Sequence, residues 1–231
     1  MMAHRRRTVL ACLIVAAGLG GASGFCAGRD HGGMLRSGTA FFVSRSGEML
    51  TSAHVVRGCR RIDVWAGDTK RVTATLAAID ERRDLALLVT NHPVEAAARP
   101  LDRTVRAVPA GAPVYTIGFG LTPSSPLVPV MTRGSVRGTS RSRGHGLLVL
   151  HAALHEGNSG GPVVDAQGVL VGMIVGRYAD KPDIGVAVPA RDLAQFLDAR
   201  STAPPLPAAG SAAMVPDARL RQISALVQCV E

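Results

Sequence analysis

A glycine-rich segment around one serine carries the strongest chemical signal in this 231-residue sequence. It spans residues 156–162 (EGNSGGP) and places Ser159 between glycines. A serine hydroxyl is a poor nucleophile until a base takes its proton. The flanking glycines permit a sharp turn, and the amides of Gly157 and Ser159 are natural donors to a developing oxyanion. The segment predicts a nucleophile, with an ordinary glycine turn as the alternative, so a base is needed elsewhere in the chain.

His54 and Asp84 are the candidates for that base and its partner. His54 lies among small and β-branched residues in segment 51–56 (TSAHVV). An imidazole base needs a carboxylate that holds its tautomer and stabilises the imidazolium. Asp84 opens the apolar run 84–88 (DLALL), where a half-buried acid is unfavourable unless it has a partner. We therefore expect His54 and Asp84 to act together with Ser159.

These three segments resemble those of trypsin-like serine proteases, specifically the exported bacterial HtrA/Deg-type branch. Residues 38–43 (GTAFFV) and 185–189 (GVAVP) are similar to the strand before the histidine and to the last strand before the terminal helix. The order His, Asp, Ser is that of chymotrypsin, and the intervals of 30 and 75 residues also resemble that branch. The resemblance covers roughly residues 36–199.

The resemblance implies an all-β, chymotrypsin-like fold of two antiparallel six-stranded β-barrels, lying perpendicular to one another, with a C-terminal helix. The peptidase domain would span 25–200, with barrels at about 34–99 and 112–189 and a helix at 190–199. His54 and Asp84 would come from the first barrel and Ser159 from the second. The amides of Gly157 and Ser159 would form the oxyanion hole, and no cofactor or metal is implied.

The resemblance also suggests where substrate side chains bind. Ala153 would lie at the base of the primary pocket, with Val175, Gly176 and Arg177 along its wall. Because no acid lies at that base, cleavage after Lys or Arg is not favoured. We expect a small or medium apolar residue before the scissile bond.

The elements that must position these residues are mainly short strands. Between residues 36 and 188, short β-type runs alternate with Gly, Pro, Asn and Asp, which is typical of a β-sandwich or barrel. Residues 189–199 have apolar residues at helical spacing after Pro189, and residues 217–230 show a second such pattern. The Pro- and Ala-rich segment 201–211 reads as a linker, so residues 201–231 are expected to be a linker followed by a short helix.

The N-terminus has the pattern of a secretory signal peptide. Three arginines at positions 5–7 precede a short apolar stretch and then small residues, with cleavage expected after Gly24. Export would place the protein in the periplasm or outside the cell, without stable membrane association once the signal is removed. An oxidising compartment favours a disulfide between two of Cys26, Cys59 and Cys229, and the pairing stays open; cleavage after Ala27 would leave Cys59 and Cys229 as an even pair.

Composition excludes several classes of protein and explains the charge. With 47% hydrophobic residues the chain is not intrinsically disordered. The chain has a net charge of +9, and nearly all of its basic residues are arginines. Loss of residues 1–24 would lower the net charge to +6. Because aromatic residues make up only 3% and no nucleic-acid module is present, we expect no nucleic-acid partner.

Two further clusters have ordinary interpretations beside functional ones. His151, His155 and Glu156 would suggest zinc on a helix, but we expect them on a strand and turn. The basic segment 133–145 is interpreted as a solvated loop, with a site-flanking regulatory loop, or a contact for acidic partners, as the alternative.

Departures from the resemblance limit what it implies. Digestive proteases carry an aspartate before the serine, which pairs with a new N-terminus; here Asn158 is neutral, so we expect no activation of that type. The 31 residues after position 200 are too few for a PDZ domain.

The leading hypothesis is an exported serine endopeptidase acting on polypeptides, with a role in protein quality control. The alternatives are a non-proteolytic or chaperone-like binder on the same scaffold and a binder of acidic polymers or membrane surfaces. Oligomeric state is left open.

Overall fold

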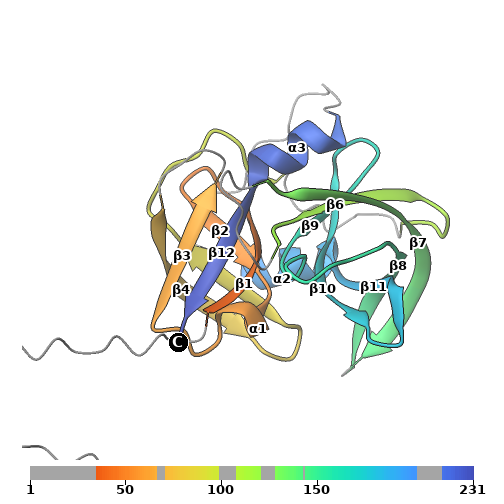
Figure 1. The fold of residues 1–231 in the computed structure, drawn as a ribbon, viewed down its shortest axis with the longest axis horizontal. Helices are drawn as coiled ribbons and strands as arrows, with labels where there is room; N and C mark the ends of the chain where they lie inside the picture. Colours follow the sequence, from red (N-terminus) through yellow and green to blue (C-terminus); the bar gives the residue numbers. More distant parts are fainter. Residues whose placement is uncertain (1–34, 67–70, 99–107, 121–127, 143, 202–214) are drawn as a thin grey trace, which may run out of the picture. The chain divides into compact units, whose positions relative to one another are not determined.

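Figure 1 shows the fold of the chain in a computed structural model. The structure describes residues 35–66, 71–98, 108–120, 128–142, 144–201 and 215–231. The expected signal peptide, Cys26 and nearly all of the expected linker lie outside these residues. Across the ranges just given, no helix is long and apolar enough to cross a membrane.

The first barrel is closed by six antiparallel strands in the order β1-β12-β3-β4-β5-β2. A four-residue helix, α1 (Ala53–Val56), follows its second strand. The strands are β1 (Leu35–Phe42), β2 (Glu48–Thr51), β3 (Arg61–Ala66), β4 (Val72–Asp80), β5 (Leu85–Val89) and β12 (Ser224–Val230).

The second barrel also has six antiparallel strands, in the order β10-β11-β8-β7-β6-β9. The expected fold class of two six-stranded barrels is therefore confirmed. Helix α2 (Ala190–Asp198) follows the last strand of this barrel, as expected, and α3 (Pro216–Ile223) precedes β12. The strands are β6 (Pro113–Gly118), β7 (Val130–Ser142), β8 (His145–His151), β9 (Pro162–Asp165), β10 (Leu170–Tyr178) and β11 (Lys181–Pro189).

Continuous apolar runs arise where a strand is buried on both faces. Along β5, Ala86 and Leu88 point into the core of the first barrel, whereas Leu85 and Leu87 join a second core. That second core combines β1, β2 and β5 with residues of β10, β11 and α2, including Leu193 and Phe196. Because successive side chains on a strand point to opposite faces, a strand between two cores has no polar face. The shared core holds the two barrels against each other.

The expected helix over residues 217–230 is wrong in its second half. Helix α3 ends at Ile223, and Ser224–Val230 is strand β12, which pairs with both β1 and β3. Six of its seven residues are buried. A helix would leave the edges of β1 and β3 without backbone partners, so closure of the barrel overrides the helical spacing.

The basic segment after residue 130 is also not a loop. It forms β7, the longest strand described, and pairs with β6 and β8. Of its 13 residues, only Thr132 and Val136 are buried, and Arg133 stacks over the Tyr115 ring at 5.9 Å. A strand with one largely solvated face carries few apolar residues, which is why its sequence resembles a loop.

A disulfide joins Cys59 to Cys229, with their Cα atoms 5.3 Å apart. Cys59 follows α1, and Cys229 lies in β12. This settles the pairing that the sequence leaves open, because Cys229 reaches Cys59 only through the strand that the helical pattern conceals. The covalent link therefore ties the last strand of the chain to the segment that carries His54.

Candidate active site

His54 and Asp84 form a directly hydrogen-bonded pair. The Nδ1 atom of His54 lies 2.7 Å from Oδ2 of Asp84, and the backbone N–H of His54 donates to Oδ1 of the same carboxylate at 2.9 Å. The backbone N–H of Ala53 also donates to the Asp84 carbonyl. With Nδ1 held by the carboxylate, Nε2 is left for a second partner, which is the arrangement a general base requires.

A turn between β4 and β5, held by hydrogen bonds to Asp80, positions Asp84. Oδ1 of Asp80, at the end of β4, accepts hydrogen bonds at 3.1 Å from the backbone N–H groups of both Arg82 and Arg83. Asp84 then adopts φ +59°, a left-handed conformation that aspartate tolerates better than most residues. Asp80 is not among the residues predicted from the sequence, although an aspartate two and three residues before Arg82 and Arg83 is the usual signature of such a turn.

The serine segment is a tight loop between β8 and β9. Asn158 is 4% exposed; its side-chain Oδ1 accepts a hydrogen bond from His155 N–H at 2.7 Å, and its own N–H donates to the His155 carbonyl. The Asn158 carbonyl accepts a bond from Gly161. A neutral amide thus closes the loop internally, at the position where digestive proteases carry an ion-paired aspartate.

Gly157 and Gly160 are required by the path of this loop. They adopt φ of +94° and +85°, and a Cβ at either position would lie within 2.0 Å of a backbone oxygen, that of Phe119 or Thr39. Only glycine accepts both the conformation and the close approach. The loop is therefore packed directly against backbone from both barrels.

The backbone amides of Gly157 and Ser159, the expected oxyanion donors, have no acceptor among the described residues. The amides of Asn158 and Gly160, by contrast, are both used: Asn158 donates to the His155 carbonyl, and Gly160 donates to the Ile174 carbonyl at 2.8 Å. Buried N–H groups are nearly always paired in proteins. Two unpaired donors around a serine therefore fit a site that binds an oxygen of a ligand.

Ser159 lies beside the strand end that leads to His54. A Cβ on the adjacent Gly160 would be 3.0 Å from the Ser52 backbone nitrogen, and the Ser52 hydroxyl donates to the same Ile174 carbonyl. In the part of the chain that the structure describes, no hydrogen bond joins Ser159 Oγ to His54. Catalytic hydrogen bonds in unliganded sites are commonly long and tighten when substrate binds.

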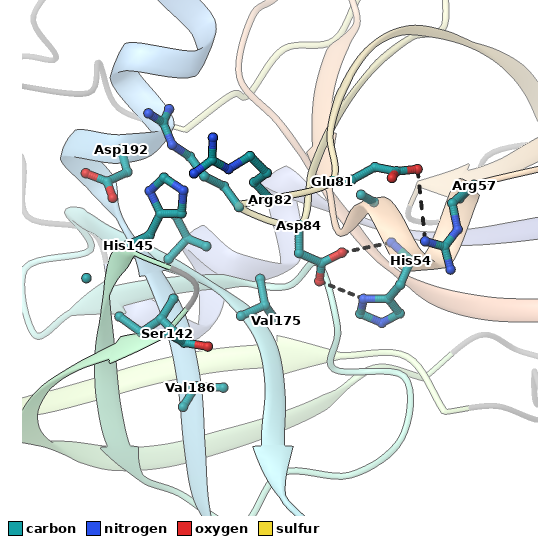
Figure 2. A pocket seen from close by; sticks show the side chains of 15 residues that line it. His54, Arg57, Glu81, Arg82, Asp84, Ser142, His145, Val175, Val186 and Asp192 are labelled. Carbon is teal, nitrogen blue, oxygen red and sulfur yellow. Dashed lines mark hydrogen bonds and ion pairs between the residues drawn. The ribbon is translucent and has the colours of Figure 1, made fainter.

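A cavity of about 370 Å³ opens beside the His54–Asp84 pair (Figure 2). His54 and Asp84 form one wall with the β4–β5 turn, while His145 at the start of β8 lies opposite. The end of the basic segment therefore flanks the candidate site. Val175 of β10 also lines the cavity, which provides space for a side chain next to the imidazole.

The expected pocket residues are not gathered around one described cavity. Val175 lines the cavity beside His54, whereas Ala153 is exposed and lines another, of about 510 Å³, together with His151 and Asp183. Gly176 is half-buried, and Arg177 is exposed. Nε2 of His151 pairs with Asp183 at 3.2 Å, and no metal-binding cluster occurs in the ranges described. His151 thus ends strand β8 and Glu156 lies in the turn before Ser159, as expected.

Comparison with known proteins defines the class of this fold and site. The family model described as "Trypsin-like peptidase domain" matches residues 38–173, more than half of the sequence. The chain belongs to the trypsin-like peptidase family.

Individual relatives narrow the class further. The chain is 29% identical over 168 residues to serine protease Rv3671c of Mycobacterium tuberculosis, covering 68% of this chain and 40% of that protein. It is 32% identical over 174 residues to serine protease HTRA4 of Homo sapiens, covering 72% and 36%. The solved structure of the Rv3671c protease in its active form matches with a TM-score of 0.58 at 27% identity, covering 77% of this chain and 78% of that one.

Homologues of the chain thus include serine proteases of the HtrA family, and the domain is of the serine-type peptidase class of hydrolases. The chain spans less than half the length of the first curated relatives it matches.

Proposed function

We propose that the chain is an exported serine endopeptidase that hydrolyses peptide bonds of polypeptides through His54, Asp84 and Ser159. The observation that carries the proposal is the His54–Asp84 pair, which leaves Nε2 free, next to a serine loop with two unpaired amides. Family membership supports the same chemistry. The serine supplies a nucleophile, the histidine–aspartate pair a general base, and the two amides donors for the oxyanion, so the proposed reaction needs no cofactor.

In the proposed acylation step, Ser159 Oγ attacks the carbonyl carbon of the scissile bond while His54 Nε2 takes the hydroxyl proton. The carbonyl oxygen becomes an oxyanion that accepts hydrogen bonds from the amides of Gly157 and Ser159. The intermediate collapses as His54 returns the proton to the leaving amine, which leaves an acyl ester on Ser159. Throughout, the Asp84 carboxylate stabilises the imidazolium and keeps the ring in place.

In deacylation, water replaces the amine. His54 accepts a proton from water as the oxygen attacks the ester, the same two amides bind the second oxyanion, and the proton passes to Ser159 Oγ. The products are a free carboxylate, a free amine and the regenerated enzyme. Removing one such oxyanion donor lowers kcat by about 10²–10³-fold in a serine protease.

We further propose that substrate pairs as an extended strand with the free edge of β10. Pairing with β9 ends at Met173, and from Val175 onward the described residues of β10 pair only with β11. An added antiparallel strand would run toward Ser159, so residues on the amino side of the scissile bond would lie along Val175, Gly176 and Arg177. We expect the residue before that bond to be small or medium-sized and apolar. A peptide-library digest tests this, and strict cleavage after Arg would refute it.

Export through the N-terminal signal would place this activity in the periplasm or outside the cell, and a quality-control role is the physiological proposal. N-terminal sequencing of the protein purified from a secreting host tests the first part. A mature N-terminus at residue 25 supports export with cleavage after Gly24, whereas a protein that keeps residues 1–24 inside the cell contradicts it.

A fluorophosphonate probe tests the enzymatic proposal most directly. Ser159 Oγ displaces fluoride from phosphorus only if the hydroxyl is activated, so we expect labelling of the intact protein at neutral pH. Ser159→Ala should abolish both labelling and peptide hydrolysis, while its melting temperature should equal that of the wild-type protein. Absence of labelling in the wild-type protein would favour a non-proteolytic binder on the protease scaffold.

A further inference from the structure

One residue of the first barrel, Thr39 in β1, contacts the serine loop of the second barrel through both its backbone and its side chain. Its backbone N–H donates to the Ser159 carbonyl at 2.9 Å. Its hydroxyl donates to the Gly157 carbonyl at 2.6 Å and accepts a hydrogen bond from Phe119 N–H at 3.1 Å. Thr39 is fully buried, so water does not compete for these bonds.

The two carbonyls that Thr39 holds belong to the two residues whose amides are the expected oxyanion donors. Gly157 has the wide rotational freedom of glycine and sits at φ +94° with its Cα against the Phe119 carbonyl. Without a bond on its carbonyl, rotation about Gly157 would turn its amide away from the site. The Thr39 hydroxyl restrains that rotation and also fixes the Phe119 backbone on the other side of Gly157.

Thr39 is itself rigidly placed. It pairs with Leu226 of β12, and its own carbonyl accepts a hydrogen bond from the Thr51 hydroxyl at 2.7 Å. A β-branched side chain in a strand also has few χ1 rotamers. Its hydroxyl is therefore held in one place relative to the loop, and it forms no hydrogen bond with His54 or Asp84.

We propose that Thr39 is a positioning residue for the oxyanion-hole amides of Gly157 and Ser159. The inference rests on the proposed function, because it assigns a task within that reaction. An interaction that orients donors for a developing charge contributes to the transition state and little to ground-state binding. Loss of the hydroxyl should therefore lower kcat and leave KM nearly unchanged.

The test compares Thr39→Val with Thr39→Ser. Valine keeps the shape and removes the hydroxyl, and we expect kcat for a peptide substrate to fall by about 10- to 100-fold, less than the loss of a whole donor. KM should stay within about twofold, and the acidic limb of the pH–rate profile should not move, because the His54–Asp84 pair is untouched. Serine restores the hydroxyl and should recover kcat to within about threefold of wild type.

Thr116→Val is the matched control. Thr116 is a threonine of β6, 3% exposed, whose hydroxyl has no hydrogen-bond partner among the described residues. The same atoms are removed from a buried strand, so kcat should remain at the wild-type value. If the Thr39→Val protein melts below the assay temperature, Thr39→Ala must show the same fall in kcat at unchanged KM.

Three results would overturn the inference: turnover by folded Thr39→Val at the wild-type rate, failure of serine to restore it, or a rise in KM at constant kcat. These differ from a failure of the proposed function, which would appear in the wild-type protein as absence of labelling by the fluorophosphonate probe. That outcome would overturn both proposals, whereas a labelled wild type with an equally reactive Thr39→Val overturns this one alone.

Discussion

Removal of the Cys59–Cys229 disulfide should destabilise the protein by about 3–5 kcal/mol. The bond links residues separated by 170 positions, and the chain-entropy relation for a loop of that size gives about 5 kcal/mol at 25 °C. Measured losses for native disulfides fall in the range of about 2–5 kcal/mol. For a domain of this size that corresponds to a fall in melting temperature of roughly 6–20 °C.

The assay is urea unfolding at neutral pH of Cys59→Ala, Cys229→Ala and the double variant, with oxidised and reduced wild type alongside. Alanine is used because Cys229 is fully buried and serine would bury a hydroxyl. Either single substitution breaks the whole link, so the double variant should lose little more than each single one. Reduced wild type should behave like the variants.

Two results would refute this reasoning. A difference below about 1 kcal/mol between oxidised wild type and the double variant would mean that the cross-link does not restrict the unfolded chain as the loop size requires. Additive losses in the two single variants would mean that the two sulfur atoms act independently and are not bonded.

The remaining predictions concern the candidate site. Gly157→Ala should lower kcat by at least about 10²-fold, because its Cβ would meet the Phe119 carbonyl at 1.8 Å and displace an oxyanion donor. Gly111→Ala, at φ +84° with nothing within 4 Å, should lose only about 1 kcal/mol of stability and no activity. Arg82 lies exposed in the wall of the cavity beside the histidine, so Arg82→Glu should reduce kcat/KM by about 2- to 5-fold for peptides with an acidic residue near the amino side of the scissile bond. Arg45→Glu, the same charge change outside that cavity, should not; equal effects of both would show that only net charge matters.

The chemistry was easier to predict than two of the elements that support it. The candidate nucleophile and the histidine–aspartate pair lie in short segments whose composition reflects local requirements: glycines at positive φ, and an acid at the head of a buried run. Strand β5 can be predicted from its sequence because both of its faces are buried, which gives a continuous apolar run. Strands β7 and β12 do not, because one is largely solvated and the other has apolar residues at spacings that suit a helix as well as a strand.

Residues Ser224–Val230 form strand β12 and not a helix because of partners elsewhere in the chain, so these seven residues alone do not predict the strand. Its backbone groups are needed by β1 and β3, more than 150 residues earlier in the chain. The disulfide partner of Cys59 is hidden for the same reason. A pattern that fits two local structures is resolved by the edges available for pairing, and these exist only once the rest of the barrel is placed.

Thr39 connects this closing strand to the chemistry. β1 lies between β2, which leads to His54, and β12, which ends the chain. Its residue 39 pairs with Leu226 on one side and binds the carbonyls of Gly157 and Ser159 across the barrel boundary. β1 is hydrogen-bonded both to β2, which leads to His54, and to the serine loop. A shift of β1 relative to β2 would therefore move the serine loop relative to the imidazole. In this arrangement the hydrogen bonds of β1 supply much of the relative placement of nucleophile and base, which a sequence motif for either residue alone does not contain.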